Sequence, residues 1–140
     1  MQAKFIPYSK ALLHGDTLLK ESERHYAFMN SRRTVREFSR QPIATEVIEN
    51  IIMSASTAPS GANKQPWTFC IVTNPSLKSQ IRVEAEKEEY ESYHGRMPQE
   101  WLDDLSNLGT DWQKPFLELA PALIIVFKHS YDLKEGHKKT

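Results

Sequence analysis

Apolar residues recur along the chain at two spacings, one typical of helices and one typical of buried strands. Over residues 45–56 they fall at i, i+1, i+4, i+5 and i+8, which predicts an amphipathic helix with Thr45 as its N-cap. Residues 67–73 and 122–127 are apolar almost throughout and rich in β-branched side chains, so each predicts a strand buried on both faces. Because two strands do not form a stable sheet alone, we expect further strands outside this chain or from a partner subunit.

Residues 75–93 predict a long helix of a different character. Asn74 is suited to cap its N-terminus, and Pro75 is suited to its first position. Eight of its 19 positions are charged, so we expect a largely solvated helix. Its apolar stripe is thin and consists of Leu77, Ile81 and Ala85.

The rest of the chain has a weaker pattern. Residues 16–29 carry apolar side chains at mixed helical spacing and predict another helix, and residues 99–119 predict short helices. Residues 57–66 contain two prolines and one glycine, which predicts a loop. Residues 1–8 are expected to form an irregular arm, and the tail after residue 127 is polar and has no core face.

Composition narrows the class of protein. The length of 140 residues suits one ordinary domain. Lys and Arg total 18 and Asp and Glu total 18, and this zero net charge argues against a nucleic-acid partner.

No apolar run is long enough to span a membrane, and the one cysteine, Cys70, excludes an internal disulfide. We therefore expect a cytoplasmic protein with no membrane partner, in which Cys70 is a buried, inert thiol. The histidines lack metal-ligand spacing, so no metal site is expected.

The first candidate site is a basic cluster at residues 31–36, which holds three guanidinium groups and two hydroxyls. Guanidinium groups bind phosphate oxygens in a bidentate way, so the cluster is suited to an anion. Arg33 and Arg36 are spaced i, i+3 and would share one face of a helix. The alternative is a solvated basic patch paired with acidic neighbours.

The second candidate is the loop at residues 58–67, between a helix and a strand. Gly61 would allow close approach of the backbone to an anion or a planar ring. The loop contains neither a Walker motif nor a GxGxxG motif. The alternative is a simple connecting turn.

The third candidate is formed by Glu89, Tyr93 and Lys114. Glu89 and Tyr93 are spaced i, i+4 and share a helix face. A carboxylate for an amine and an ammonium for a carboxylate would together hold a zwitterion. The alternative is a solvated, charge-rich helix end. No sequence signature identifies a catalytic nucleophile, so the catalytic residue is unknown.

Several motifs between Tyr26 and Lys128 resemble those of the FMN-dependent nitroreductase superfamily, and within it most closely the iodotyrosine deiodinases. They are TVREF, PIATEVIENII, STAPSGANKQPWTF, EKEEYESYHGRM, EWLDDL, TDWQKPFLE and APALIIVFK. The resemblance implies an α+β, nitroreductase-like fold with a central mixed sheet flanked by helices. It also implies a single domain over residues 1–140 that is incomplete, because chains of the family continue further.

The resemblance also implies roles for individual residues. The FMN site would consist of Arg32, Arg33, Thr34, Arg36, Pro59 and Ser60, with Asn63 as a weaker candidate. The backbone N–H of Ala62 would face the phenolate of the substrate. Glu89, Tyr93 and Lys114 would close over its amino acid group as a lid.

The implied activity is the reductive dehalogenation of halotyrosines, giving tyrosine and halide. The implied assembly is a homodimer with FMN at the interface, and the external electron donor is unknown. Two alternatives stay open: a general NAD(P)H-dependent nitroreductase or flavin reductase, and a non-catalytic module that binds an anion or a protein partner.

Overall fold

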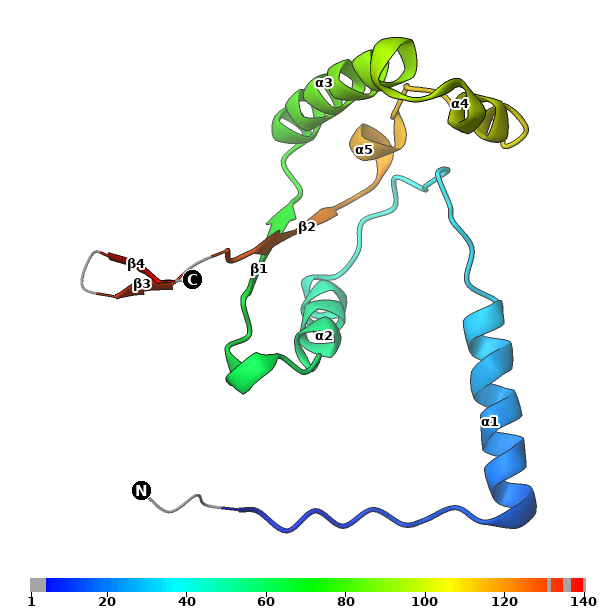
Figure 1. Cartoon of the computed structure of the whole chain (residues 1–140), viewed down its shortest axis with the longest axis vertical. Coiled ribbons are helices and arrows are strands. Elements are labelled where there is room, and N and C mark those ends of the chain that lie inside the picture. Colours follow the sequence, from blue (N-terminus) through cyan, green and yellow to red (C-terminus); the bar gives the residue numbers. More distant parts are fainter. Residues whose placement is uncertain (1–4, 131, 135–136, 140) are drawn as a thin grey trace. The chain divides into compact units, whose positions relative to one another are not determined.

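The computed structural model describes residues 5–130, 132–134 and 137–139 (Figure 1). It divides into two compact units, the first ending at Val35 and the second starting at Arg36. The single-domain organisation of residues 1–140 stays a prediction. Residues 1–4 of the expected irregular arm lie outside the described residues.

The first unit contains helix α1, Gly15–Asn30, which confirms the helix expected over 16–29. Residues 5–14 before it contain neither helix nor strand, as expected for an arm. Ser31 caps the C-terminus of the helix, and its N–H donates to the carbonyl of Ala27 at 3.1 Å. Its large apolar side chains, Leu18, Leu19, Tyr26 and Phe28, are all exposed.

The second unit is built on a pair of antiparallel strands. Strand β1, Trp67–Val72, pairs with β2, Leu123–Lys128, in the register that sets Trp67 opposite Lys128. Both predicted strands are thus confirmed. In the polar tail, β3, Asp132–Lys134, and β4, His137–Lys139, form a second antiparallel pair. The apolar pattern did not predict these two strands, because they carry mostly polar residues.

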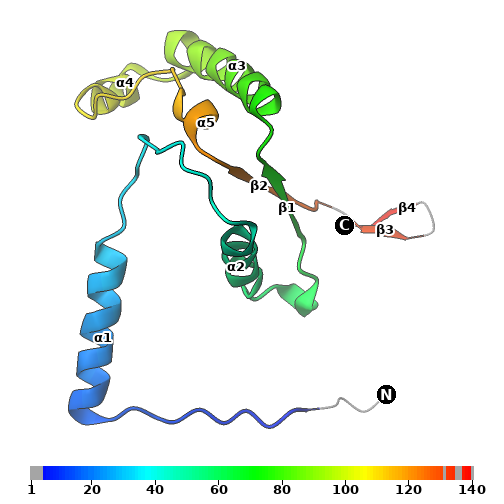
Figure 2. The same cartoon turned by 180° about the vertical axis from the view of Figure 1, so that it is seen from behind.

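Helices precede and separate the two central strands. Helix α2, Thr45–Ser56, leads through a short 3-10 turn, η1, Gly61–Asn63, into β1. After β1 come α3, Pro75–Glu91, a π-helical turn, η2, Ser92–Arg96, and then α4, Gln99–Ser106, and α5, Phe116–Leu119. Helix α3 lies beside α5 in both views (Figures 1 and 2). The α+β class is confirmed.

The start of α3 follows the sequence closely. The Asn74 side-chain oxygen accepts a hydrogen bond from the Leu77 N–H at 3.0 Å, and Pro75 occupies the first helical position. The start of α2 differs from the prediction that Thr45 is its N-cap. The extended residue at that end is Ala44, whose carbonyl accepts from the N–H groups of Val47 and Ile48, so Thr45 is already helical.

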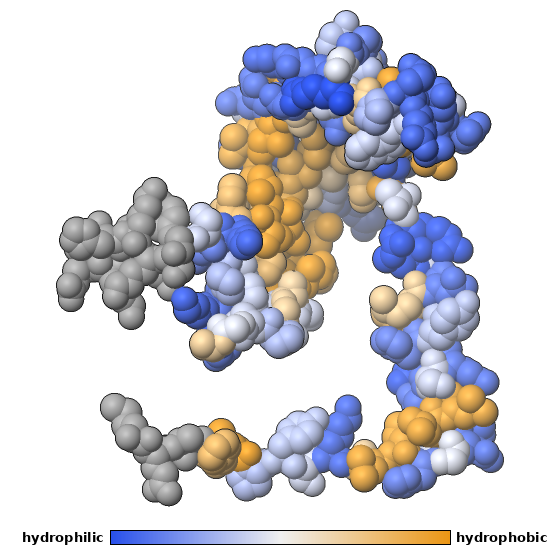
Figure 3. All heavy atoms as spheres, viewed as in Figure 1, coloured by the Kyte–Doolittle hydropathy of each residue, from blue (hydrophilic) through white to orange (hydrophobic). Residues whose placement is uncertain are grey.

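The predicted burial of both strands on both faces is wrong. Among the described residues the buried apolar side chains are Ile48, Val72 and Ala120, while Val126 is 57% and Phe127 54% exposed. Figure 3 shows hydrophobic residues gathered on the surface around the strands. The reason is that each described strand has one neighbour and the faces of the pair stay open. Cys70 is accordingly half-buried, not buried.

The helical face proposed for Arg33 and Arg36 is also wrong, because residues 32–44 contain no helix. Two features favour extended and turn backbone here. The Ser39 hydroxyl accepts the N–H of Gln41 at 3.0 Å, and Pro42 disfavours helical backbone at the residue before it.

Candidate functional site

Helix α3 turns a row of charged and polar side chains toward residues 110–120. The predicted apolar stripe is wrong in part, because Leu77 is 44% exposed. The side chains that make contacts are spaced four, four, three and four residues apart, which sets them on one helix face. We call them the polar row: Lys78, Arg82, Glu86, Glu89 and, in η2, Tyr93.

Lys78 holds the end of α5. Its ammonium group donates to the carbonyl of Ala120 at 2.6 Å and to the carbonyl of Glu118 at 3.1 Å. Lys78 is 6% exposed, the lowest exposure of any charged residue that the structure describes. Because the last carbonyls of a helix lack intrahelical partners, an ammonium group there satisfies them and complements the helix dipole.

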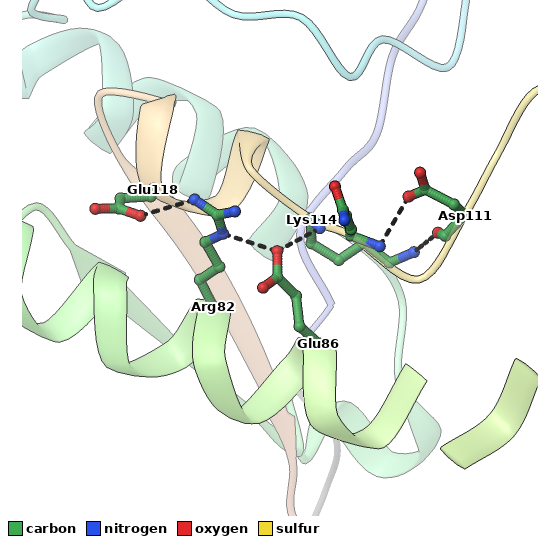
Figure 4. A network of polar contacts seen from close by, with 6 residues as sticks. Arg82, Glu86, Asp111, Lys114 and Glu118 are labelled. Atoms are coloured by element: carbon green, nitrogen blue, oxygen red, sulfur yellow. Dashed lines mark hydrogen bonds and ion pairs between the residues drawn. The ribbon is translucent and has the colours of Figure 1, made fainter. Parts of the chain in front are cut away.

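Arg82 bridges two carboxylates in the middle of the polar row (Figure 4). Its Nε donates to Glu86 Oε1 at 2.7 Å, and its Nη1 donates to Glu118 Oε2 at 3.1 Å. The hydrogen bond from Arg82 holds the pKa of Glu86 below its ordinary value, although burial acts in the opposite direction. The two carboxylates in turn raise the pKa of Arg82, so this group stays charged.

The loop between α4 and α5 is fastened to the polar row. Glu86 Oε1 also accepts the main-chain N–H of Lys114 at 2.7 Å. The ring of Trp112 meets Tyr90 edge to face, with centroids 5.3 Å apart. Within the loop, an Asp111 carboxylate oxygen accepts the N–H of Gln113 at 2.8 Å.

The structure brings Glu89, Tyr93 and Lys114 together. Lys114 Nζ lies 3.5 Å from Glu89 Oε2 and 5.9 Å from the centroid of the Tyr93 ring. The same ammonium group donates to the Asp111 carbonyl at 2.6 Å, and the Tyr93 hydroxyl lies 3.3 Å from the Thr110 hydroxyl. The expected grouping is present, and its role in binding a substrate stays a prediction.

This group of three offers one carboxylate and one ammonium side by side. The Glu89 side chain is 39% exposed and the Lys114 side chain 16% exposed, so solvent still reaches the pair. Partly exposed ion pairs contribute little free energy, so a ligand can replace this one at small cost. A zwitterion would present its ammonium to Glu89 and its carboxylate to Lys114.

The loop at 57–66 is confirmed, but its unusual backbone is not at the glycine. Ala62, Asn63 and Gln65 have φ of 52°, 53° and 46°, and a Cβ added at Gly61 would meet open space. The turn is held by Asn63 N–H to Ser60 carbonyl at 3.0 Å and by Gln65 N–H to Ser60 Oγ at 2.9 Å. Within the described residues the Ala62 N–H has no acceptor.

The basic cluster is exposed and lies in two units. In the first unit, Arg33 Nη1 donates to the carbonyls of Asn30 and Arg32 at 2.6 and 2.8 Å. The Arg32 guanidinium and the Thr34 hydroxyl make no hydrogen bond to the described residues. In the second unit, Arg36 and Lys114 both line an open pocket of about 450 Å³.

Sequence reasoning missed the residues that support the group of three, above all Arg82 and Glu86. The signal was the spacing of Lys78, Arg82 and Glu86 at i, i+4 and i+8, in line with Glu89 and Tyr93. Charged residues at that spacing lie on one helix face. Such a face can pack against a polar partner as well as face solvent.

In the ranges that the structure describes, no cluster of three or more His, Cys, Asp or Glu side chains is arranged to hold a metal ion. None of the described helices combines the length and the apolar character needed to cross a membrane.

Comparison with known proteins identifies relatives that span most of this chain. The nitroreductase family matches residues 29–140. An iodotyrosine deiodinase of Haliscomenobacter hydrossis is 60% identical over 129 residues, which cover 92% of this chain and 58% of the relative. Iodotyrosine deiodinase 1 of Homo sapiens is 41% identical over 134 residues, which cover 96% of this chain and 46% of the relative. The chain thus spans about half the length of these relatives.

A solved structure agrees with the fold. The crystal structure of oxidized iodotyrosine deiodinase bound to FMN and 3-iodo-L-tyrosine matches with a TM-score of 0.66 at 39% identity. The match covers 74% of this chain and 55% of that chain. The resemblance and the nitroreductase-like fold expected from the sequence are confirmed.

Proposed function

This chain belongs to the nitroreductase family, and from that premise we propose that it takes part in the FMN-dependent reductive dehalogenation of halotyrosines. The observation that carries the substrate class is the group of Glu89, Tyr93 and Lys114, in which Lys114 Nζ lies 3.5 Å from Glu89 Oε2. The iodotyrosine deiodinases among the relatives support the same substrate.

The side chains of this group bind the amino acid end of the substrate in our proposal. Glu89 accepts from the α-ammonium group, Lys114 donates to the α-carboxylate, and Tyr93 packs against the same zwitterion. Ala62 acts at the other end of the substrate, where its N–H donates to the phenolate oxygen. An N–H without another acceptor favours the phenolate over the neutral phenol. Closure of the lid excludes water and fixes the orientation of the ring.

The residues assigned to FMN fit that group chemically. Arg32 and Arg36 are exposed guanidinium groups without a hydrogen-bond acceptor among the described residues, as a phosphate site requires. Arg33 and Thr34 add a guanidinium and a hydroxyl next to Arg32. Beside the isoalloxazine ring we place Pro59 and Ser60. Ser60 Oγ accepts from Gln65, which leaves its hydroxyl hydrogen available to donate.

When bound in its reduced form, FMN would supply two electrons, and with one proton from the reduced flavin or the solvent a carbon–hydrogen bond would replace the carbon–halogen bond as halide leaves. The proposal includes a homodimer with FMN between the subunits, where Pro59 and Ser60 can serve the FMN of the neighbouring subunit. It also includes a cytoplasmic setting, which the single cysteine supports.

The substitution Glu89→Gln tests the proposed function. In the full-length, FMN-loaded protein we expect the affinity for 3-iodotyrosine to fall about tenfold to about a hundredfold, because a charge-assisted hydrogen bond to the ammonium is lost. The measurement is a titration that follows flavin fluorescence. FMN affinity should not change, because the cofactor is held elsewhere.

2-Iodophenol, which lacks the amino acid group, is the matched control ligand. It should bind weakly and with equal affinity to the wild type and to Glu89→Gln. Equal affinity of the two proteins for 3-iodotyrosine would contradict the assigned role of Glu89. Turnover of nitroarenes without turnover of 3-iodotyrosine would favour a general nitroreductase instead.

A further inference from the structure

We infer that Glu86 is a positioning residue, whose carboxylate holds the main chain of Lys114 so that the Lys114 ammonium stays beside Glu89 and Tyr93. This inference rests on the proposed function of the group of three, and it adds a residue that touches neither substrate nor cofactor.

The geometry that carries the inference is centred on one oxygen atom. Glu86 Oε1 accepts from the Lys114 N–H and from Arg82 Nε, both at 2.7 Å (Figure 4). Arg82 is fixed in turn by Glu118 on α5, at 3.1 Å. The Glu86 side chain is 17% exposed, so the solvent screens these bonds weakly. The anchor therefore ties the loop before α5 to a helix that is itself held in place.

Lys114 needs such an anchor because of its place in the chain. It lies at the end of the irregular segment 107–115, just before Pro115 and the short helix α5. Its own side chain contacts the Asp111 carbonyl in the same loop, the Glu89 carboxylate and the ring of Tyr93. A ligand carboxylate would compete for the ammonium group. The main-chain bond to Glu86 does not take part in that competition and persists when a ligand binds.

The positive charge of Arg82 keeps the Glu86 carboxylate able to accept hydrogen bonds. It is the partner of Arg82 at 2.7 Å, and this hydrogen bond keeps the carboxylate ionised, as its lowered pKa indicates. Glu89 is the carboxylate that lies near the Lys114 ammonium. Glu86 thus binds the main chain of Lys114, and Glu89 pairs with its side chain.

The test uses Glu86→Ala, Glu86→Gln and the control Glu84→Ala in the full-length, FMN-loaded protein. Glu84 is an exposed residue of the same helix, and its side chain makes no hydrogen bond or ion pair to the described residues. We expect Glu86→Ala to weaken 3-iodotyrosine binding about tenfold while leaving 2-iodophenol and FMN binding unchanged. Glu86→Gln retains an acceptor oxygen and should restore most of the affinity.

A double substitution separates positioning from general destabilisation. In a Lys114→Gln background, Glu86→Ala should cause no further loss of 3-iodotyrosine affinity, because its effect passes through Lys114. A loss of the same size in both backgrounds would overturn the inference. So would an equal loss of affinity for 2-iodophenol.

Hydrogen exchange of the Lys114 amide tests the anchor without any ligand. Exchange in Glu86→Ala should be at least about tenfold faster than in the wild type, while Glu84→Ala should leave it unchanged. Unchanged exchange in Glu86→Ala would overturn the inference. If the anchor is present but the wild type does not bind 3-iodotyrosine, the proposed function fails and the role of Glu86 in it fails too. If the wild type binds and Glu86→Ala binds equally well, only the role of Glu86 fails.

Discussion

At the scale of single residues, Lys114 is held through two of its atoms. Its main-chain N–H donates to Glu86 at 2.7 Å, and its ammonium group lies 3.5 Å from Glu89. The first contact fixes where the residue is, and the second leaves its charge available for exchange with a ligand. In the proposed site, Lys114 would thus combine a fixed backbone with a replaceable ion pair.

Lys78 gives a prediction about stability. Replacing it by methionine keeps most of the volume but leaves the carbonyls of Glu118 and Ala120 without their donor. We expect Lys78→Met to lower the free energy of unfolding by about 1–3 kcal/mol. Urea denaturation measures the effect. Lys87→Met is the control, because Lys87 is exposed on the same helix. Equal free energies of unfolding for the two variants would contradict this role of Lys78.

Sequence reasoning reached some of these residues and not others, for a physical reason. The i, i+4 spacing of Glu89 and Tyr93 is a local pattern. Lys114 is distant in sequence, and its grouping with them rests on complementary charge and on the resemblance. The burial of Lys78 depends on carbonyl groups 40 and 42 residues further along. No local pattern contains that information, so Lys78 was expected in solvent.

At the scale of the element, α3 is a helix that contacts its neighbours in large part through hydrogen bonds and ion pairs. Its start at Asn74 and Pro75 could be predicted, because capping depends on residues adjacent in sequence. The contacts of its polar row could not be predicted, because the sequence pattern of a charged helix face is the same whether that face meets water or a polar partner. This polar contact makes the docking of α3 on α5 sensitive to pH.

Glu86 sets the direction of that pH dependence. Its pKa in the folded protein is lowered, so the stability that it contributes is fully present above its ordinary pKa of about 4.3. That stability is lost as the pH falls through the lowered value. We expect the wild type to exceed Glu86→Gln in free energy of unfolding at about pH 7, and the difference to shrink with acidification. Denaturation at several pH values measures it, with Glu84→Gln as control. A difference that grows at low pH would contradict the assignment.

At the scale of the whole molecule, the open faces of β1 and β2 are the main feature. The periodicity predicted both strands correctly but not their exposure, because burial depends on what packs against them. Ile71 is 43% exposed and Val126 57% exposed. Apolar strand faces of this kind are typical of an interaction surface, and the proposed homodimer would be one way to cover it.

The assembly can be measured directly. We expect the full-length, FMN-loaded protein to sediment as a dimer with one FMN for each subunit, because the flavin is proposed to lie between subunits. Analytical ultracentrifugation with detection of flavin absorbance gives mass and stoichiometry together. A monomer that retains one FMN would contradict the shared site.

The left-handed backbone at Ala62 has a consequence for how recognition can evolve. Every amino acid except proline supplies a main-chain N–H, so almost any codon change at this position preserves the donor. What a replacement alters is the conformational cost of a φ of 52°, which glycine relieves and a β-branched residue increases. In the proposed site, most substitutions of Ala62 would thus preserve the hydrogen bond from its main-chain N–H to the phenolate. Specificity for the amino acid end would depend there on the side chains of Glu89, Tyr93 and Lys114, each of which one missense mutation can remove.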